Sequence, residues 1–163
     1  MDVKLSIFDA AKWFIENNDS VTPKKLQKLL YYLYAWGLVF LNENIDDLND
    51  KVFSGEFEAW VHGPVNRDVY EEYKSYGGNL IKISDANETK IENPDTLNLM
   101  TQINRIYGKY DGNTLELLTH SEDPWKKARG SARPLDRCQN VLDDAEMFKS
   151  CLLYTSPSPR DTR

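Results

Sequence analysis

Two histidines, and the carboxylates that follow one of them, are the residues of this chain whose types could do chemistry. His62 and His120 are far apart, and Glu122 and Asp123 follow the second. Histidine and carboxylate side chains can hold zinc or act as a general-base pair. The spacing argues against both, because His120, Glu122 and Asp123 fall at a predicted junction between helices, where a carboxylate is an ordinary cap. We therefore expect no catalytic residue, no metal and no cofactor.

Aromatic and basic residues in two segments suit a binding surface. Trp, Tyr and Arg are the residue types enriched at the energetic centres of protein interfaces. We expect segments 60–67 and 125–137 to meet in the fold and to share one surface that contacts a partner. The predicted partner-binding residues are Trp60, His62, Arg67, Tyr70, Trp125, Lys126 and Arg129.

The same residues also have structural interpretations. The aromatic ones suit a hydrophobic core, and the basic ones suit a solvated face with surface ion pairs of small value. Gly63 and Pro64 predict a tight turn between a strand and the next helix, because proline fixes its own φ and biases the residue before it away from the helical region. A rigid turn holds its neighbours at low entropic cost, which favours binding.

A helix over residues 22–41 is the element expected to position these segments. Thr22 followed by Pro23 is a helix-start signal. From Leu29 onward this helix is apolar or aromatic on every face, which is typical of a helix buried on several sides. Its uncharged run is too short to span a bilayer, so we expect no membrane contact. One apolar stripe is predicted along it, formed by Leu26, Leu29, Leu30, Leu33, Gly37 and Phe40.

The remaining patterns predict mainly helices. A strand is expected over 57–61, and a hairpin over 80–83 and 89–91. Helices are expected over about 7–17, 67–76, 94–111, 113–120, 124–129 and 140–148, with Asn93 capping the third and Asn113 with Glu116 starting the fourth. The third should bury Leu99, Ile103, Ile106 and Tyr110. We therefore expect a mainly α fold, a single-domain helical bundle around a central apolar helix with a small β element.

The composition of the chain limits its possible binding partners and its cellular compartment. The chain has 163 residues, of which 40% are hydrophobic, enough for one domain with a real core. With 26 acidic and 20 basic residues its net charge is −6, so no general basic field favours nucleic acid. It has two cysteines, and its first residues lack the apolar core of a secretory signal, so we expect a cytoplasmic protein.

The last thirteen positions are expected to lie outside the native domain. Residues 151–163 read CLLYTSPSPRDTR, which resembles the translation of a transposon-end adapter used in sequencing libraries. Such segments are set aside before fold reasoning. The expected domain is therefore 1–150, and native residues are expected to have followed Ser150.

Three blocks of the sequence, at 26–38, 57–77 and 117–130, resemble the Panacea antitoxin domain family. The family includes SocA-like antitoxins and phage-associated GepA-like proteins, and the likeness extends from Ser6 to about Phe148. It implies a non-catalytic cytoplasmic protein, from a bacterium or phage, that neutralises a co-encoded toxin by direct binding. At least one relative delivers its toxin to a protease, which adds a cytoplasmic protease as a second partner. At the position of His62 the family often has Tyr.

Two other functions compete with that interpretation. The short helices after Asn93 could form a helix-turn-helix of a DNA-binding autorepressor, although the apolar stripe occupies the positions that would face a groove. An enzyme using His62 and His120 is less favoured still. Nucleic acid is thus expected only in autorepression, and we expect the protein not to be an enzyme.

Overall fold

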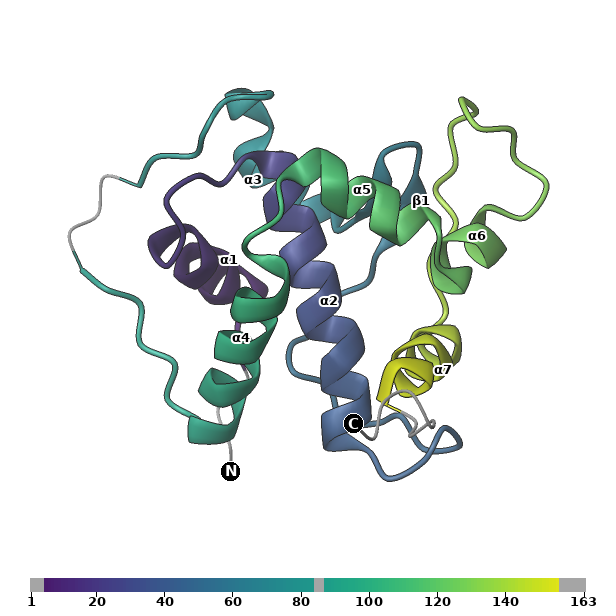
Figure 1. Ribbon diagram of the computed structural model, residues 1–163, viewed down its shortest axis with the longest axis horizontal. Coiled ribbons are helices and arrows are strands. Elements are labelled where there is room, and N and C mark those ends of the chain that lie inside the picture. Colours follow the sequence, from purple (N-terminus) through teal and green to yellow (C-terminus); the bar gives the residue numbers. More distant parts are fainter. Residues whose placement is uncertain (1–4, 84–86, 156–163) are drawn as a thin grey trace.

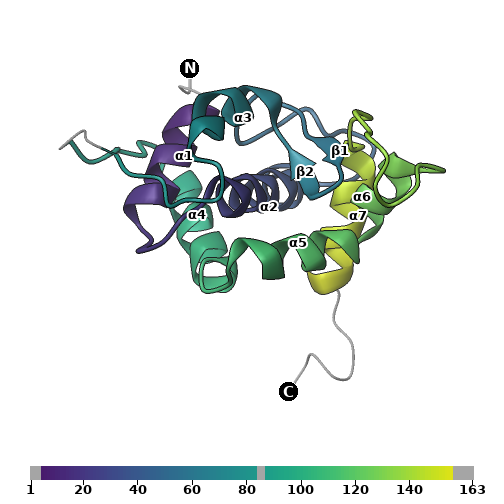
Figure 2. The same cartoon turned by 90° about the horizontal axis from the view of Figure 1, so that it is seen from above.

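One helix, α2 (Pro23–Leu41), lies at the centre of the fold. In the computed structural model, which describes residues 5–83 and 87–155, the other elements form a ring around it (Figure 2). α2 begins as its sequence predicts, because the side chain of Thr22 accepts a hydrogen bond from the Lys25 amide and Pro23 occupies the first turn. The prediction of a central helix is confirmed.

Six further α-helices, one short 3₁₀ helix and one hairpin surround α2 in the described part of the chain (Figure 1). The mainly α prediction is therefore confirmed. The elements are α1 (Ile7–Glu16), β1 (Glu58–Trp60), β2 (Gly63–Val65), α3 (Arg67–Tyr73), η1 (Lys74–Tyr76), α4 (Pro94–Tyr107), α5 (Gly112–His120), α6 (Asp123–Arg129) and α7 (Asp144–Thr155). α2 contacts α1, α3, α4, α5 and α7, and it also contacts β2.

The hairpin differs from the prediction in where its turn lies. The predicted strand is confirmed as β1, but Gly63 and Pro64 belong to β2, where Pro64 pairs with Ala59. The turn is formed by Val61 and His62, between the two strands. The turn therefore presents the His62 side chain instead of the glycine and proline.

Two helices differ from their predicted apolar stripes. Phe40, in the last turn of α2, is 61% exposed, because the ring of neighbours does not cover that end of the helix. α4 stops at Tyr107, before the predicted end, and exposes Ile106 while it buries Met100 and Tyr107. The stripe was assigned one position out of phase at this end of α4.

α5 is capped by Asp111, whose side chain accepts from the Thr114 amide, so the predicted start at Asn113 is wrong. Asn113 and Glu116 instead bind the Lys24 ammonium group at 2.9 and 2.6 Å. This pairing ties α5 to the first turn of α2.

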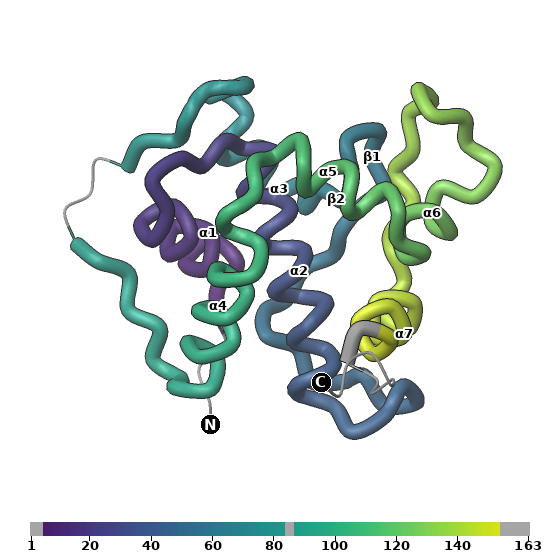
Figure 3. Tube along the Cα trace, viewed as in Figure 1, coloured from purple at the N-terminus to yellow at the C-terminus, as the bar shows by residue number. Residues whose placement is uncertain are grey.

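The second predicted hairpin is absent from the described residues 80–83 and 89–91; part of its turn, 84–86, lies outside them. Ile81 is buried, and its amide donates to the Val21 carbonyl instead of to a partner strand. Thr89 bonds the Glu16 carboxylate at the end of α1. Figure 3 shows the described parts of the chain between η1 and α4, residues 77–83 and 87–93, on the outer side of α1.

The last helix enters the segment that was expected to take no part in the fold. α7 begins at Asp144, after the predicted start, and continues past Ser150, and Cys151 is only 5% exposed within the core cluster. The origin of residues 151–163 stays a prediction, and 156–163 lie outside the described residues. No helix in the described part of the chain has the length and apolar character needed to cross a membrane.

Candidate partner-binding site

The hairpin and α6 meet directly, as the sequence predicts for segments 60–67 and 125–137. The indole Nε1 of Trp125 donates to the Trp60 carbonyl at 2.8 Å. One turn further along α6, the Arg129 guanidinium donates to the Ala59 carbonyl at 3.0 Å. α6 therefore holds the backbone of β1 at two successive residues.

The tip of the hairpin is held from α5. Nε2 of His120 lies 2.9 Å from the Val61 carbonyl, so that nitrogen carries the proton and donates it. The imidazole ring stacks on Trp125, with centroids 4.1 Å apart. Burial lowers the pKa of His120, and the nearby Glu116 charge opposes this only in part. His120 is thus a neutral donor that positions the turn.

Glu116, on α5, joins the exposed turn to α2. Its carboxylate accepts from Nδ1 of His62 at 2.9 Å and from Nζ of Lys24 at 2.6 Å. Burial alone would raise the pKa of Glu116, but these two hydrogen bonds and the accompanying charges lower it below its usual value. The His62 side chain remains 68% exposed.

Lys28 lies buried in α2 beneath the hairpin. Its Nζ is 3.4 Å from the Pro64 carbonyl, and burial lowers its pKa to about 7, with Glu116 opposing the shift. Gly63 packs on the lysine stem: a Cβ there would lie 2.5 Å from Lys28 Cε. This contact was not predicted from the sequence, although a lysine followed at once by an all-round apolar run is a signal of burial.

A groove opens between the hairpin turn, the end of α5, α6 and the chain that follows α6. It has a volume of about 480 Å³. Its lining includes the apolar residues Val61, Trp125 and Leu135, while His62 and Lys126 add polar groups. We call it the hairpin–α6 groove.

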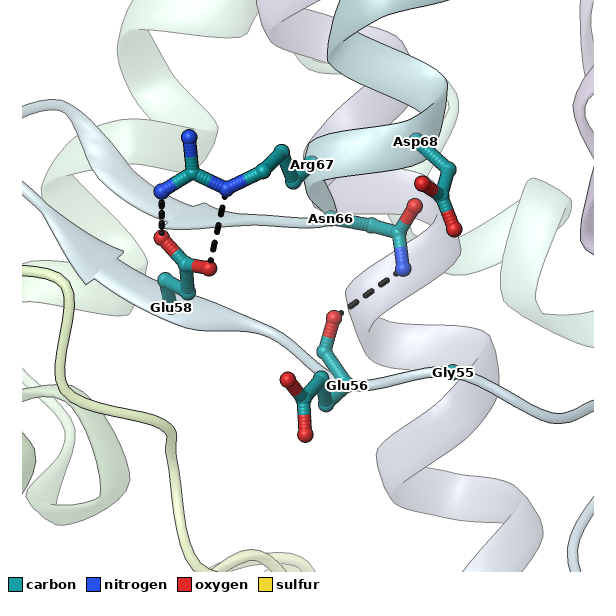
Figure 4. Close-up of a pocket in the computed structure, with 6 residues that line it drawn as sticks. All are labelled: Gly55, Glu56, Glu58, Asn66, Arg67 and Asp68. Carbon is teal, nitrogen blue, oxygen red and sulfur yellow. Dashed lines mark hydrogen bonds and ion pairs between the residues drawn. The ribbon is translucent and has the colours of Figure 1, made fainter.

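A second group of predicted residues gathers around Trp60. Arg67 donates two hydrogen bonds to the Glu58 carboxylate, at 2.8 and 3.3 Å, as Figure 4 shows. The Trp60 indole donates to the same carboxylate at 2.8 Å and meets the Tyr70 ring edge-on at 4.8 Å. The Arg67 guanidinium lies 5.6 Å from the Trp60 ring centroid. We call these four residues, Glu58, Trp60, Arg67 and Tyr70, the Trp60 cluster.

The Trp60 cluster borders a polar hollow of about 550 Å³. Asn66 lies in it, but its groups are already used: its side chain caps α3 and donates to the Glu56 carbonyl, and its backbone exchanges two hydrogen bonds with the Gln27 amide. In Figure 4 the Glu56 carboxylate points away from Arg67. The outward-facing chemistry of this hollow is therefore carboxylate and guanidinium.

The predicted residues are therefore brought together as two neighbouring groups, joined by the backbone of β1. Arg129 differs from the prediction in its exposure. It was predicted as a surface charge, but it is only 5% exposed. It donates to the carbonyls of Ala59, Arg133 and Asp136 and lies 5.1 Å from the Trp125 ring centroid. Its role in the fold is to tie the chain after α6 to β1.

The cluster considered for catalysis does not assemble. The Glu122 carboxylate is buried and accepts from the Tyr32 hydroxyl at 3.0 Å, while His120 faces Val61. Glu122 occupies the capping position of α6 without a side-chain capping bond, so the predicted cap is wrong. Among the described residues, no group of three or more His, Cys, Asp or Glu side chains could hold a metal ion.

The protein is thus a helical domain with an exposed hairpin turn, and we call the hairpin braced because side chains of α5 and α6 hold its backbone by hydrogen bonds. Residues 26–126 match the family described as "Antitoxin SocA-like, Panacea domain", and the chain belongs to that family. The match spans well over half of the chain and includes Lys28, the hairpin, Glu116 and Trp125. Comparisons with curated proteins and with solved structures found no match.

Proposed function

We propose that this protein is the antitoxin of a bacterial or phage toxin–antitoxin pair and that it neutralises a co-encoded toxin in the cytoplasm by binding it directly. Membership of the SocA-like Panacea family is the single observation that carries this proposal, because the family is antitoxin-like. The braced hairpin supports it, since groups already fixed in place lose little entropy on binding.

The exposed members of the Trp60 cluster and the hairpin–α6 groove are the proposed contact residues. Trp60, Tyr70 and Arg67 combine two aromatic rings with a guanidinium, the chemistry of interface hot spots. Arg67 and Tyr70 are exposed, whereas Arg129 is buried, so Arg129 contributes by holding the surface in shape.

Co-expression with the product of the neighbouring open reading frame tests the proposal. That product should arrest growth alone, and this chain should restore growth and co-purify with it. Arg67→Glu should abolish the rescue, because it reverses a charge at the centre of the contact. Lys74→Glu is the matched control, since Lys74 is another exposed cation paired with a carboxylate, that of Glu71. Rescue without co-purification, or no arrest to rescue, would overturn direct neutralisation.

Delivery of the bound toxin to a protease is the finer alternative within the same proposal. Masking leaves the amount of toxin unchanged, whereas delivery shortens its lifetime. The half-life of the toxin with and without this chain, measured after protein synthesis is stopped, separates the two routes.

A further inference from the structure

We infer that the hairpin–α6 groove receives an acidic segment of the toxin that carries a large apolar side chain; this inference rests on the proposed function. The apolar part of the argument comes from the lining. Leu135 is 87% exposed at the groove, and the Trp125 ring, stacked on His120, forms another part of its wall. A hollow of about 480 Å³ lies within the size range of sites that enclose small ligands.

Charge complementarity decides the polar part of the occupant. Lys126 is exposed beside the groove, and in the described part of the chain it makes no ion pair with a carboxylate. Arg129 donates its hydrogen bonds to neutral carbonyl oxygens, so no bonded carboxylate neutralises its positive charge. This corner is cationic in a chain whose net charge is −6.

Glu116 is the one acidic residue among the described residues that line the groove, and it is already engaged. Both of its oxygens accept hydrogen bonds, one from Lys24 and the other from His62. Its charge is thus largely compensated within the protein. A carboxylate arriving from a partner would meet a site of net positive charge, which attracts acidic segments and repels basic ones.

The walls of the groove are fixed before any partner arrives. His120 holds the turn at Val61, Trp125 holds β1 at Trp60, and Arg129 holds the chain after α6 through the Arg133 and Asp136 carbonyls. Sites held this way bind with less ordering cost. A protein segment fits better than nucleic acid, because a nucleic acid would need many phosphate contacts and much of this lining is apolar.

The first experiment measures the affinity of the purified chain for the co-encoded toxin by calorimetry. Lys126→Glu should weaken binding by about tenfold or more, and the loss should shrink at high salt, because a charge contact is screened. Lys127→Glu is the matched control on the next residue of α6. Lys127 pairs with Glu146, away from the groove, so the affinity of this variant for the toxin should stay within about twofold of the parent's.

The second experiment identifies the occupant. A photo-crosslinking benzoyl-phenylalanine at Leu135 should capture the toxin, and mass spectrometry should place the crosslink in an acidic segment beside a large apolar residue. The same group at Phe40, exposed at the far end of α2, should capture little.

The outcomes separate the two claims. A parent chain that neither binds nor rescues removes the proposed function and this inference together. The inference about the groove alone is overturned if the parent rescues growth but Lys126→Glu binds the toxin equally tightly. The same holds if the parent rescues growth and the Leu135 crosslink lies in a basic segment. Loss of promoter-DNA binding by Lys126→Glu, with unchanged affinity for the toxin, would assign the groove to nucleic acid and also overturn it.

Discussion

Trp125 donates its indole hydrogen to the carbonyl of Trp60, 2.8 Å away and 65 positions earlier in the chain. This bond places α6 against the hairpin and brings the two predicted binding segments together. It also separates their roles, because the Trp60 side chain faces Tyr70 and Arg67 while the Trp125 ring lines the hairpin–α6 groove. The proposed antitoxin surface is therefore two adjoining sites on one rigid support.

Arg129→Ala should lower the free energy of unfolding by about 2–4 kcal/mol, because a buried guanidinium bonded to three carbonyls is lost and those acceptors lose their donor. Arg67→Ala should leave the unfolding midpoint nearly unchanged, since Arg67 lies at the surface. Chemical denaturation of both variants makes the comparison. Equal, small losses would mean that Arg129 is not structurally required.

These two arginines show what sequence reasoning could and could not reach. Helix starts depend on neighbours along the chain, so the caps at Thr22 and Asn93 could be predicted, and so could the strand at 58–60. Burial of a cation depends on distant backbone carbonyls. Nothing near Arg129 in the sequence indicates that Ala59 accepts its hydrogen bond.

The candidate site shows the same division. The meeting of the two binding segments was predicted from residue types, but the groove depends on Leu135 and Glu116, which the sequence analysis did not include among the binding residues. Phe40 fits the helical repeat of α2 and is nevertheless exposed, because only the packing of other elements decides where the buried part of a helix ends. Periodicity alone carries no such information.

Gly63→Ala should destabilise the protein by about 2–5 kcal/mol. Gly63 has φ +107°, and an added Cβ would lie 2.5 Å from Lys28 Cε, so backbone strain and overpacking add. Gly77→Ala is the matched control: its φ is +58° and its ψ −121°, a region that L residues avoid, but nothing lies within 4 Å, so only the backbone strain of about 1–3 kcal/mol applies. Thermal unfolding compares them, and an equal cost at both positions would refute the close packing on Lys28.

Lys28 should make stability depend on pH in alkaline solution. Burial lowers its pKa from 10.5 to about 7, so between these values the unfolded chain holds a proton that the folded protein lacks, and stability rises with pH. Relative to Lys28→Met, the parent should gain up to about 1.4 kcal/mol per pH unit over this interval.

Chemical denaturation from about pH 7 to about pH 9.5 tests this dependence. His120, with a lowered pKa, titrates below that window, and Tyr32 and Tyr34, with raised pKa values, affect stability only above it. Lys25 also has a lowered pKa, but both proteins retain it, so its contribution cancels in the comparison. Parallel stability curves for parent and variant would show that Lys28 keeps its proton when folded.

Trp125→Phe should impair neutralisation more than it impairs folding. The change keeps an aromatic ring to stack on His120 but removes the donor to Trp60, so the free energy of unfolding should fall by about 1 kcal/mol. The hairpin loses one of its fixed points, and its amides should exchange faster with solvent hydrogen. Trp36→Phe is the matched control, because it removes a similar indole hydrogen bond, to the Tyr107 hydroxyl at 3.0 Å, which joins α2 to α4 and does not involve the hairpin. It should cost similar stability while the hairpin amides and growth rescue stay as in the parent. If both variants lose rescue to the same degree, reduced stability explains the effect and the Trp125–Trp60 bond has no special part in neutralisation.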